Sequence, residues 1–86
     1  MGTKDLLQER GNTHGDFTDN AEVAQAIKTI LKDGRHWVKR TDVEKEAMEM
    51  IAHKLARWVS AEKTHLDNPI DIAGYATLVV ERYEVV

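Results

Sequence analysis

The chain has 86 residues, which suits one small domain and leaves no room for a second hydrophobic core. Hydrophobic residues make up 42% and charged residues 31%, so a folded globular protein is expected rather than a disordered one. The net charge of −3 argues against broad nucleic-acid binding, and the lack of cysteine excludes disulfides and thiolate metal sites.

The apolar runs are too short for a membrane span, and the opening residues MGTKDLLQERGN lack the apolar core of a signal peptide. We therefore expect a cytoplasmic protein with no membrane partner. A domain of this length buries a limited share of its surface. A homodimer or a higher homo-oligomer is expected, because Trp37, Ile70 and Val85–Val86 have no assigned cover within one chain.

The first part of the domain, residues 1–18, is predicted to be a short helix over Lys4–Arg10 followed by a loop rich in turn-forming residues. A second helix is predicted to start with Thr18 or Asp19 as its N-cap and to run to about Leu31. Its apolar residues recur with the spacing of one helix face. They are Val23, Ala24, Ile27, Ile30 and Leu31.

The third helix has the clearest start signal in the chain. Thr41 and Glu44 match a capping box, in which each side chain accepts a hydrogen bond from the backbone N–H of the other residue. The periodic pattern continues to about Ser60. The face predicted to be apolar consists of Val43, Ala47, Met48, Ile51, Leu55, Trp58 and Val59. A second face gathers Glu46, Glu49, His53 and Arg57, with Lys54 at the border of the apolar one.

A fourth helix is predicted to begin with Asn68 as N-cap and Pro69 as its first helical residue. The residues predicted to be buried on it are Ile72, Ala73, Ala76, Val79, Val80 and Tyr83. No strand is predicted. The expected fold class is all-α: a small antiparallel bundle of four helices, the first of them short, in a single domain over residues 1–86.

Carboxylates on the last two helices are candidate ligands for Mg²⁺. Glu46 and Glu49 are three residues apart and point to the same side of one helix, and hard cations prefer such oxygen ligands. A solvated acidic face gives the same pattern. Asp71 follows Asn68 by three residues, where the helix dipole by itself accounts for a carboxylate. Asp67 precedes the predicted cap and has a weaker structural reason to be acidic, so it is a fourth candidate ligand.

Lys54 and Arg57 are candidates for binding an anionic ligand. They lie one turn apart near the end of the third helix, where cations also stabilise the negative end of the helix dipole. From the border of the apolar face, Lys54 can extend to solvent, or it can direct its charge at phosphate oxygens beside the fork of Arg57. The sequence leaves both interpretations open.

Other catalytic motifs are absent from the sequence. The four histidines lack zinc-site spacing, the glycines form no phosphate loop, and the single serine, Ser60, has no nucleophile motif around it. Any reaction is therefore expected to be metal-assisted, with water as the nucleophile.

The carboxylate pattern resembles that of the MazG-like nucleoside triphosphate pyrophosphohydrolases, which are all-α enzymes that form dimers or tetramers. Their pattern is E-E-x-x-E on one helix and E-x-x-D on the next. Lys45–Glu49 (KEAME) keeps two of the three glutamates, and Asn68–Asp71 (NPID) keeps the aspartate. Three of the five ligands in that pattern are thus present.

A closer resemblance is to small MazG-like domains, mostly encoded by phages, whose function is unassigned. Their three ordered blocks resemble Arg10–Asp16 (RGNTHGD), Lys54–Arg57 (KLAR) and Asp71–Tyr75 (DIAGY). The resemblance implies a Mg²⁺ cofactor and a nucleotide ligand. It implies Glu46, Glu49 and Asp71 as metal ligands, Lys54 and Arg57 as phosphate-binding residues, and Tyr75 and Asp16 as ligand contacts.

Two functions from different classes follow. The first is Mg²⁺-dependent hydrolysis of a nucleoside triphosphate to the monophosphate and pyrophosphate. The second is a non-enzymatic nucleotide-binding or protein-interaction module on the same bundle, which the missing metal ligands favour. A third, DNA binding, has the least support because the chain is acidic overall. It would use the basic residues Lys28, Lys32, Arg35, Lys39 and Arg40.

Overall fold

The computed structural model describes residues 15–84, which form three α-helices and one short 3-10 helix. They are α2 (Phe17–Lys32), η1 (Trp37–Lys39), α3 (Asp42–Ser60) and α4 (Asp67–Glu84). This range contains no strand, so the predicted all-α class is confirmed for it. The helix predicted over Lys4–Arg10 lies outside the described residues, and the count of four helices stays a prediction. Between residues 15 and 84, no helix is both long and apolar enough to cross a membrane.

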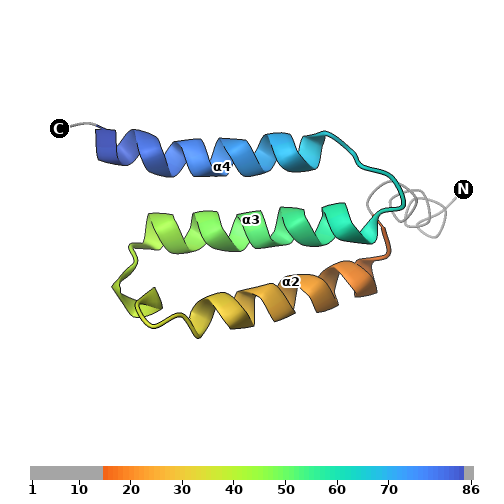
Figure 1. The fold of residues 1–86 in the computed structure, drawn as a ribbon, viewed down its shortest axis with the longest axis horizontal. Coiled ribbons are helices and arrows are strands. Elements are labelled where there is room, and N and C mark those ends of the chain that lie inside the picture. The colour runs from red at the N-terminus through yellow and green to blue at the C-terminus, as the bar shows by residue number, and fades with distance from the viewer. Residues whose placement is uncertain (1–14, 85–86) are drawn as a thin grey trace, which may run out of the picture.

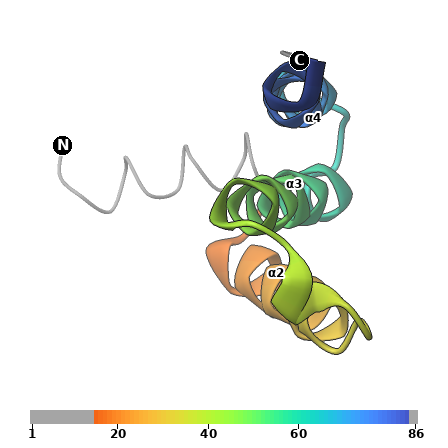
Figure 2. The same cartoon turned by 90° about the vertical axis from the view of Figure 1, so that its left-hand side faces the viewer.

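The three α-helices lie side by side in one antiparallel layer. Figure 1 shows the chain running along α2, back along α3 and forward again along α4. The view in Figure 2 shows α2 and α4 on opposite sides of α3, which contacts both of them. Each outer helix therefore packs along one side only, and the layer has two broad faces.

α2 begins earlier than predicted because Asp16, rather than Thr18 or Asp19, caps it. The Asp16 carboxylate accepts hydrogen bonds from the backbone N–H of Thr18 at 2.7 Å and of Asp19 at 3.3 Å. The preceding Gly15 has a φ of +81°, and a Cβ atom at that position would lie 2.6 Å from the carbonyl oxygen of Ser60. Gly15 therefore lets the start of α2 approach the end of α3, which a residue with a side chain could not do.

α3 has the start and the end that the sequence predicts. The Glu44 N–H donates to Thr41 Oγ1 at 3.1 Å and the Thr41 N–H donates to Glu44 Oε1 at 3.0 Å, which confirms the capping box. The hydroxyl of Tyr83 in α4 donates to the same Glu44 oxygen at 3.1 Å. The cap therefore also connects the start of α3 to the end of α4. The helix ends at Ser60, as predicted.

The predicted start of α4 is wrong, because the helix begins at Asp67 and Asn68 lies inside its first turn. The chain turns early, since the Asn68 N–H already donates to the carbonyl of His65 at 3.1 Å. The Asn68 side chain is fully buried, and its amide atoms have no hydrogen-bond partner among residues 15–84. Pro69 remains in the first turn, where its missing N–H has no helical partner to lose.

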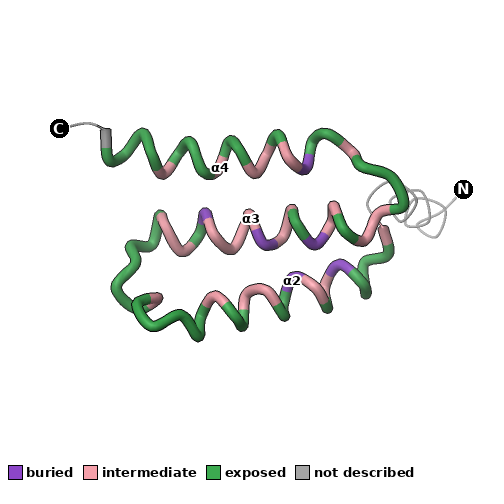
Figure 3. The backbone as a smooth tube through the Cα atoms, in the orientation of Figure 1, coloured by how far each residue is buried: buried purple, intermediate pink, exposed green. Residues whose placement is uncertain are grey.

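The buried apolar residues of the described chain are four alanines: Ala24, Ala47, Ala52 and Ala56. Ala47 and Ala56 are nine residues apart, which is about 180° around a helix, so α3 buries small side chains on two opposite sides. Small side chains let helices approach closely but remove little apolar surface from water. Figure 3 shows that few segments of the layer are buried.

The wide buried face predicted for α4 is wrong for the described chain. Ile72 and Val79 are half-buried. The other four residues predicted to be buried are exposed: Ala73, Ala76, Val80 and Tyr83. On α3, Val43, Leu55 and Val59 of the predicted apolar face are exposed as well. The reason is the arrangement of the helices. Because α4 is an outer helix that packs on α3 alone, only one narrow stripe of its surface is covered.

Candidate anion-binding site

An ion pair connects the two helices that carry most of the predicted site residues. The ammonium group of Lys54 in α3 lies 2.9 Å from Asp71 Oδ2 in α4. The Lys54 side chain is 13% exposed and the Asp71 side chain 41% exposed, so the pair is partly shielded from water. This corrects the interpretation of Asp71 as the carboxylate of a helix start. Asp67 lies in the first turn of α4 at the positive end of the helix dipole, whereas Asp71 binds Lys54.

Three cations from two helices act electrostatically on His53. Partial burial lowers the pKa of the His53 imidazole, and the positive charges of Arg57, Lys54 and Lys28 lower it further. Lys28 belongs to α2 and the other three residues to α3, so the packing of these two helices assembles the group. We call Lys28, His53, Lys54 and Arg57 the cationic cluster. The sequence groups the three residues of α3, but helical periodicity cannot show that Lys28 joins them.

Two charges of the cationic cluster lack a carboxylate partner. The ion pairs within residues 15–84 join Lys54 to Asp71, Lys32 to Glu49 and Arg40 to Glu44. None of them includes Lys28 or Arg57, so two positive charges near His53 stay uncompensated in this part of the chain. An anion bound among them would relieve their mutual repulsion, and the guanidinium fork of Arg57 can hold two phosphate oxygens at once.

The predicted metal ligands do not assemble in the described structure. Glu46 and Asp67 are exposed. Glu49 Oε1 lies 4.0 Å from the ammonium of Lys32, and Asp71 is bound to Lys54. Between residues 15 and 84, no three histidine, aspartate or glutamate side chains are close enough together to hold a metal ion. A metal ion held by three or more of these side chains therefore has no site among the described residues of one chain.

An open apolar groove runs along α4 beside the ion pair. It has a volume of about 420 Å³ and is lined by Ile70, Asp71, Gly74, Tyr75 and Leu78. Tyr75, one of the predicted ligand contacts, is half-buried in its wall. Asp71 belongs to both the groove and the ion pair, so the groove borders the cationic cluster at Lys54. The cluster and the groove therefore form one continuous candidate site.

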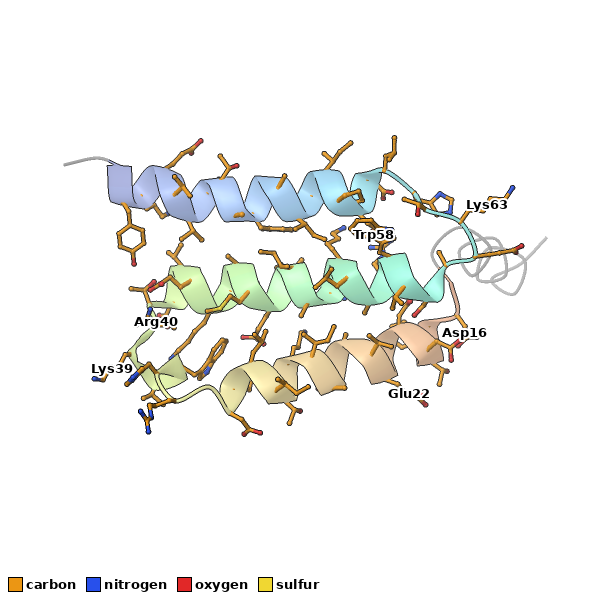
Figure 4. The ribbon with its side chains drawn as sticks, in the orientation of Figure 1. Asp16, Glu22, Lys39, Arg40, Trp58 and Lys63 are labelled. Atoms are coloured by element: carbon orange, nitrogen blue, oxygen red, sulfur yellow. The ribbon has the colours of Figure 1, made fainter. Side chains whose placement is uncertain are left out.

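Asp16, the other predicted ligand contact, caps α2 and is exposed. Figure 4 shows it at the same end of the layer as Trp58, whose side chain lies between α3 and α4. The Trp58 indole N–H donates to Thr64 Oγ1 at 3.2 Å and so holds the connection between these helices. Arg10–His14 of the first motif block lie outside the described residues. The described part of this block thus has a structural role, and its contact with a ligand stays a prediction.

Within the described part of the chain, ion pairs engage two of the five basic residues proposed for DNA binding, and one of these pairs joins Lys32 to Glu49 at 4.0 Å. Figure 4 shows Lys39 and Arg40 at the end of the layer opposite Trp58. Arg40 also forms an ion pair with Glu44 at 3.8 Å. Two of the five positive charges are thus paired with carboxylates, and a third, that of Lys28, acts on His53 in the cationic cluster.

Comparison with known proteins assigns the chain to a family. No curated protein and no solved structure matches the chain. A family model described as a domain of unknown function (DUF6378) matches residues 3–83, a range that includes all three motif blocks, the cationic cluster and the groove. On this match, the chain belongs to the DUF6378 family, a family of domains of unknown function.

Proposed function

We propose that the protein binds nucleotides, with the phosphate groups at the cationic cluster. The observation that carries this proposal is that the positive charges of Lys28, Lys54 and Arg57, from two helices, all act on His53, while neither Lys28 nor Arg57 forms an ion pair among residues 15–84. Like charges held close together repel one another, and a bound polyanion removes that repulsion. Arginine supplies a planar fork and lysine a point charge, which are the two kinds of donor that proteins commonly use for phosphate.

The motif blocks support a nucleotide rather than a simple anion as the ligand. Lys54–Arg57 and Asp71–Tyr75 are two of the three blocks that resemble small MazG-like domains. The first of these blocks contributes two members of the cationic cluster, and the second contributes three residues that line the adjoining groove. A ligand that carries both phosphates and a larger organic part matches such a combined surface.

Calorimetric titration with the eight common ribonucleoside and deoxyribonucleoside triphosphates tests the proposal. We expect the double variant Lys28→Gln, Arg57→Gln to lose at least about tenfold in affinity for the nucleotide that binds best. The control is Arg35→Gln, Lys39→Gln, which makes the same change in net charge at exposed positions away from the cluster. Equal losses in the two double variants, or no binding by the native protein, would refute phosphate binding at the cationic cluster.

Hydrolysis of the bound nucleotide to the monophosphate and pyrophosphate is the second candidate function. Its support is that Glu46 lies within about 20° of both His53 and Arg57 around α3, so a carboxylate and the cations share one face. The described residues do not supply a complete Mg²⁺ site, and no catalytic step through the ion follows from them. Pyrophosphate release in the presence of Mg²⁺, abolished by Glu46→Gln with no change in melting temperature, would establish hydrolysis that depends on this carboxylate.

We also propose that two copies of the chain pair through the apolar face of the layer. We assign to this face four exposed residues that lie about 160° to 180° around their helices from residues of the candidate site: Ile30 of α2, Leu55 and Val59 of α3, and Val80 of α4. Val80 is nine residues from Asp71, about 180° around α4, so the apolar face is opposite the candidate site. Ile30 and Val59 are 71% and 70% exposed, and a buried core of four alanines leaves much apolar surface to cover.

A further inference from the structure

We infer that the groove along α4 holds the nucleoside part of the bound nucleotide, and that Gly74 determines which ligands fit there. The inference rests on the proposed binding of phosphates at the cationic cluster. It adds the position of the other half of the ligand and the residue that controls access to it.

The charges on the two sides of Asp71 orient the ligand. On one side Asp71 binds Lys54, and Lys28 and Arg57 supply further positive charge around His53. On the other side, the groove contains the Asp71 carboxylate and no cation. A phosphate is attracted to the cluster and repelled from the groove, whereas a neutral group with N–H or O–H donors can donate to Asp71. The phosphates and the nucleoside therefore occupy opposite sides of this residue.

The groove suits a flat heterocycle. Its remaining lining is apolar or aromatic, from Ile70, Gly74, Tyr75 and Leu78. An aromatic side chain in the wall can stack against any base, because every base has a π face. The volume of about 420 Å³ is within the range of small-molecule sites. An inorganic polyphosphate has no part that could use this surface.

Gly74 keeps the middle of the groove open. A Cβ atom added to Gly74 would meet no atom within 4 Å, so no packing contact within the described chain requires glycine there. Glycine inside a helix also destabilises it relative to alanine. An intrahelical glycine with open space above it is expected where a ligand approaches the backbone closely. A larger side chain would fill that space without disturbing the fold.

Calorimetric titration tests this inference with two ligands and three proteins. The ligands are inorganic tripolyphosphate and the best-binding nucleoside triphosphate of the eight common ones. The proteins are the native chain, Gly74→Leu and Ala73→Leu, which adds bulk at the neighbouring exposed position that does not line the groove. Thermal unfolding of each variant checks the fold.

The native protein is expected to bind the nucleotide at least about tenfold more tightly than tripolyphosphate, because only the nucleotide uses the groove. Gly74→Leu should remove this advantage and leave the affinity for tripolyphosphate unchanged, whereas Ala73→Leu should preserve it. Unchanged nucleotide affinity in Gly74→Leu, or equal affinity of the native protein for both ligands, would overturn the inference while phosphate binding stood. Failure of both ligands to bind the native protein would overturn the proposed function as well.

Discussion

The ammonium of Lys54 lies 2.9 Å from Asp71 Oδ2, and this ion pair belongs to the packing of α3 on α4 and to the candidate site at once. Lys54 is a member of the cationic cluster, and Asp71 lines the groove on α4. A change at either residue therefore alters both the stability of the layer and the charge that a ligand meets. Variants of this pair need a stability measurement beside every binding measurement.

Replacing Asp71 with asparagine is expected to lower the free energy of unfolding by about 1 to 2 kcal/mol, because the largely buried ammonium of Lys54 then loses its counter-charge. Lys54→Met should cost less, since the more exposed Asp71 can be hydrated. Urea unfolding measures both changes. Glu81→Gln, which removes a carboxylate from an exposed position of α4, is the control and should change stability by less than about 0.5 kcal/mol. A loss in the control as large as that of Asp71→Asn would contradict a specific role for the pair.

Replacing Gly15 with alanine and replacing Gly74 with alanine are expected to change the stability of the protein in opposite directions. Gly15→Ala should destabilise the protein by about 2 to 4 kcal/mol, because the φ of +81° is strained for alanine and its Cβ atom would collide with the carbonyl of Ser60. Gly74→Ala should stabilise it by about 0.5 to 1 kcal/mol, because it improves helix propensity in open space. Thermal unfolding followed by circular dichroism compares them. A fall in melting temperature for both variants would show that Gly74 has a packing role.

The capping box is expected to make stability depend on acid pH. The hydrogen bond from the Thr41 N–H is the main cause that lowers the pKa of Glu44 below its ordinary value of 4.5, and the Tyr83 hydroxyl adds to it. The folded state therefore gains stability from this carboxylate above pH 4.5 and loses it as the pH falls through the lowered pKa. Unfolding measured between pH 6 and pH 3 should show a shallower decline in Glu44→Gln than in the native protein. Parallel curves would rule out this contribution.

Nucleotide binding is expected to strengthen as the pH falls through the titration range of His53. Burial and the charges of Arg57, Lys54 and Lys28 lower the pKa of His53 below 6.5, and a bound phosphate compensates those charges and raises it again. The bound state therefore takes up a proton, which favours binding at lower pH. The stability of the free protein depends on pH in the opposite direction. Because the pKa of His53 is lower in the folded state than in the unfolded state, the free energy of unfolding falls as the pH drops below 6.5.

Titrations at pH 7.5 and pH 5.5 with the native protein and His53→Gln measure this linkage. Protonation of the nucleotide itself changes affinity in both proteins equally, so the difference between them isolates His53. The native protein should gain more affinity at pH 5.5 than the variant. The same pH dependence in both proteins would exclude His53 from the phosphate site.

Self-association through the apolar face predicts the effect of a charge at Val59, which is 70% exposed on that face. Val59→Lys should convert a dimer to a monomer without lowering the helix content, because the charge enters the interface and not the core. Gln25→Lys, an exposed substitution on α2 opposite the apolar face, should leave the dimer intact. Sedimentation velocity measures the mass of each. A native protein that stays monomeric at every concentration tested would remove the proposed pairing.

Local signals predicted the helices of the described chain with errors of a few residues. Thr41 and Glu44 determine the start of α3 because both partners of the capping box are close in sequence. The N-cap of α2 is Asp16 and not the predicted Thr18 or Asp19, because a short carboxylate on extended backbone can cap a helix as well as a threonine can. The helix α4 begins at Asp67, before the predicted N-cap Asn68. Asn68 therefore lies in the first turn, where its side chain is buried.

The sequence by itself determined the helical class, the start and end of α3, and the grouping of His53 with Arg57 on one side of that helix, since these follow from contacts within one or two turns. Only the tertiary structure decided that Lys54 binds Asp71, that Lys28 completes the cationic cluster and that much of the apolar surface stays open. Each of these depends on the lateral position and rotation of one helix against another. The physical reason is that periodicity gives the direction of a side chain around its own axis, whereas packing decides which neighbour, if any, lies in that direction.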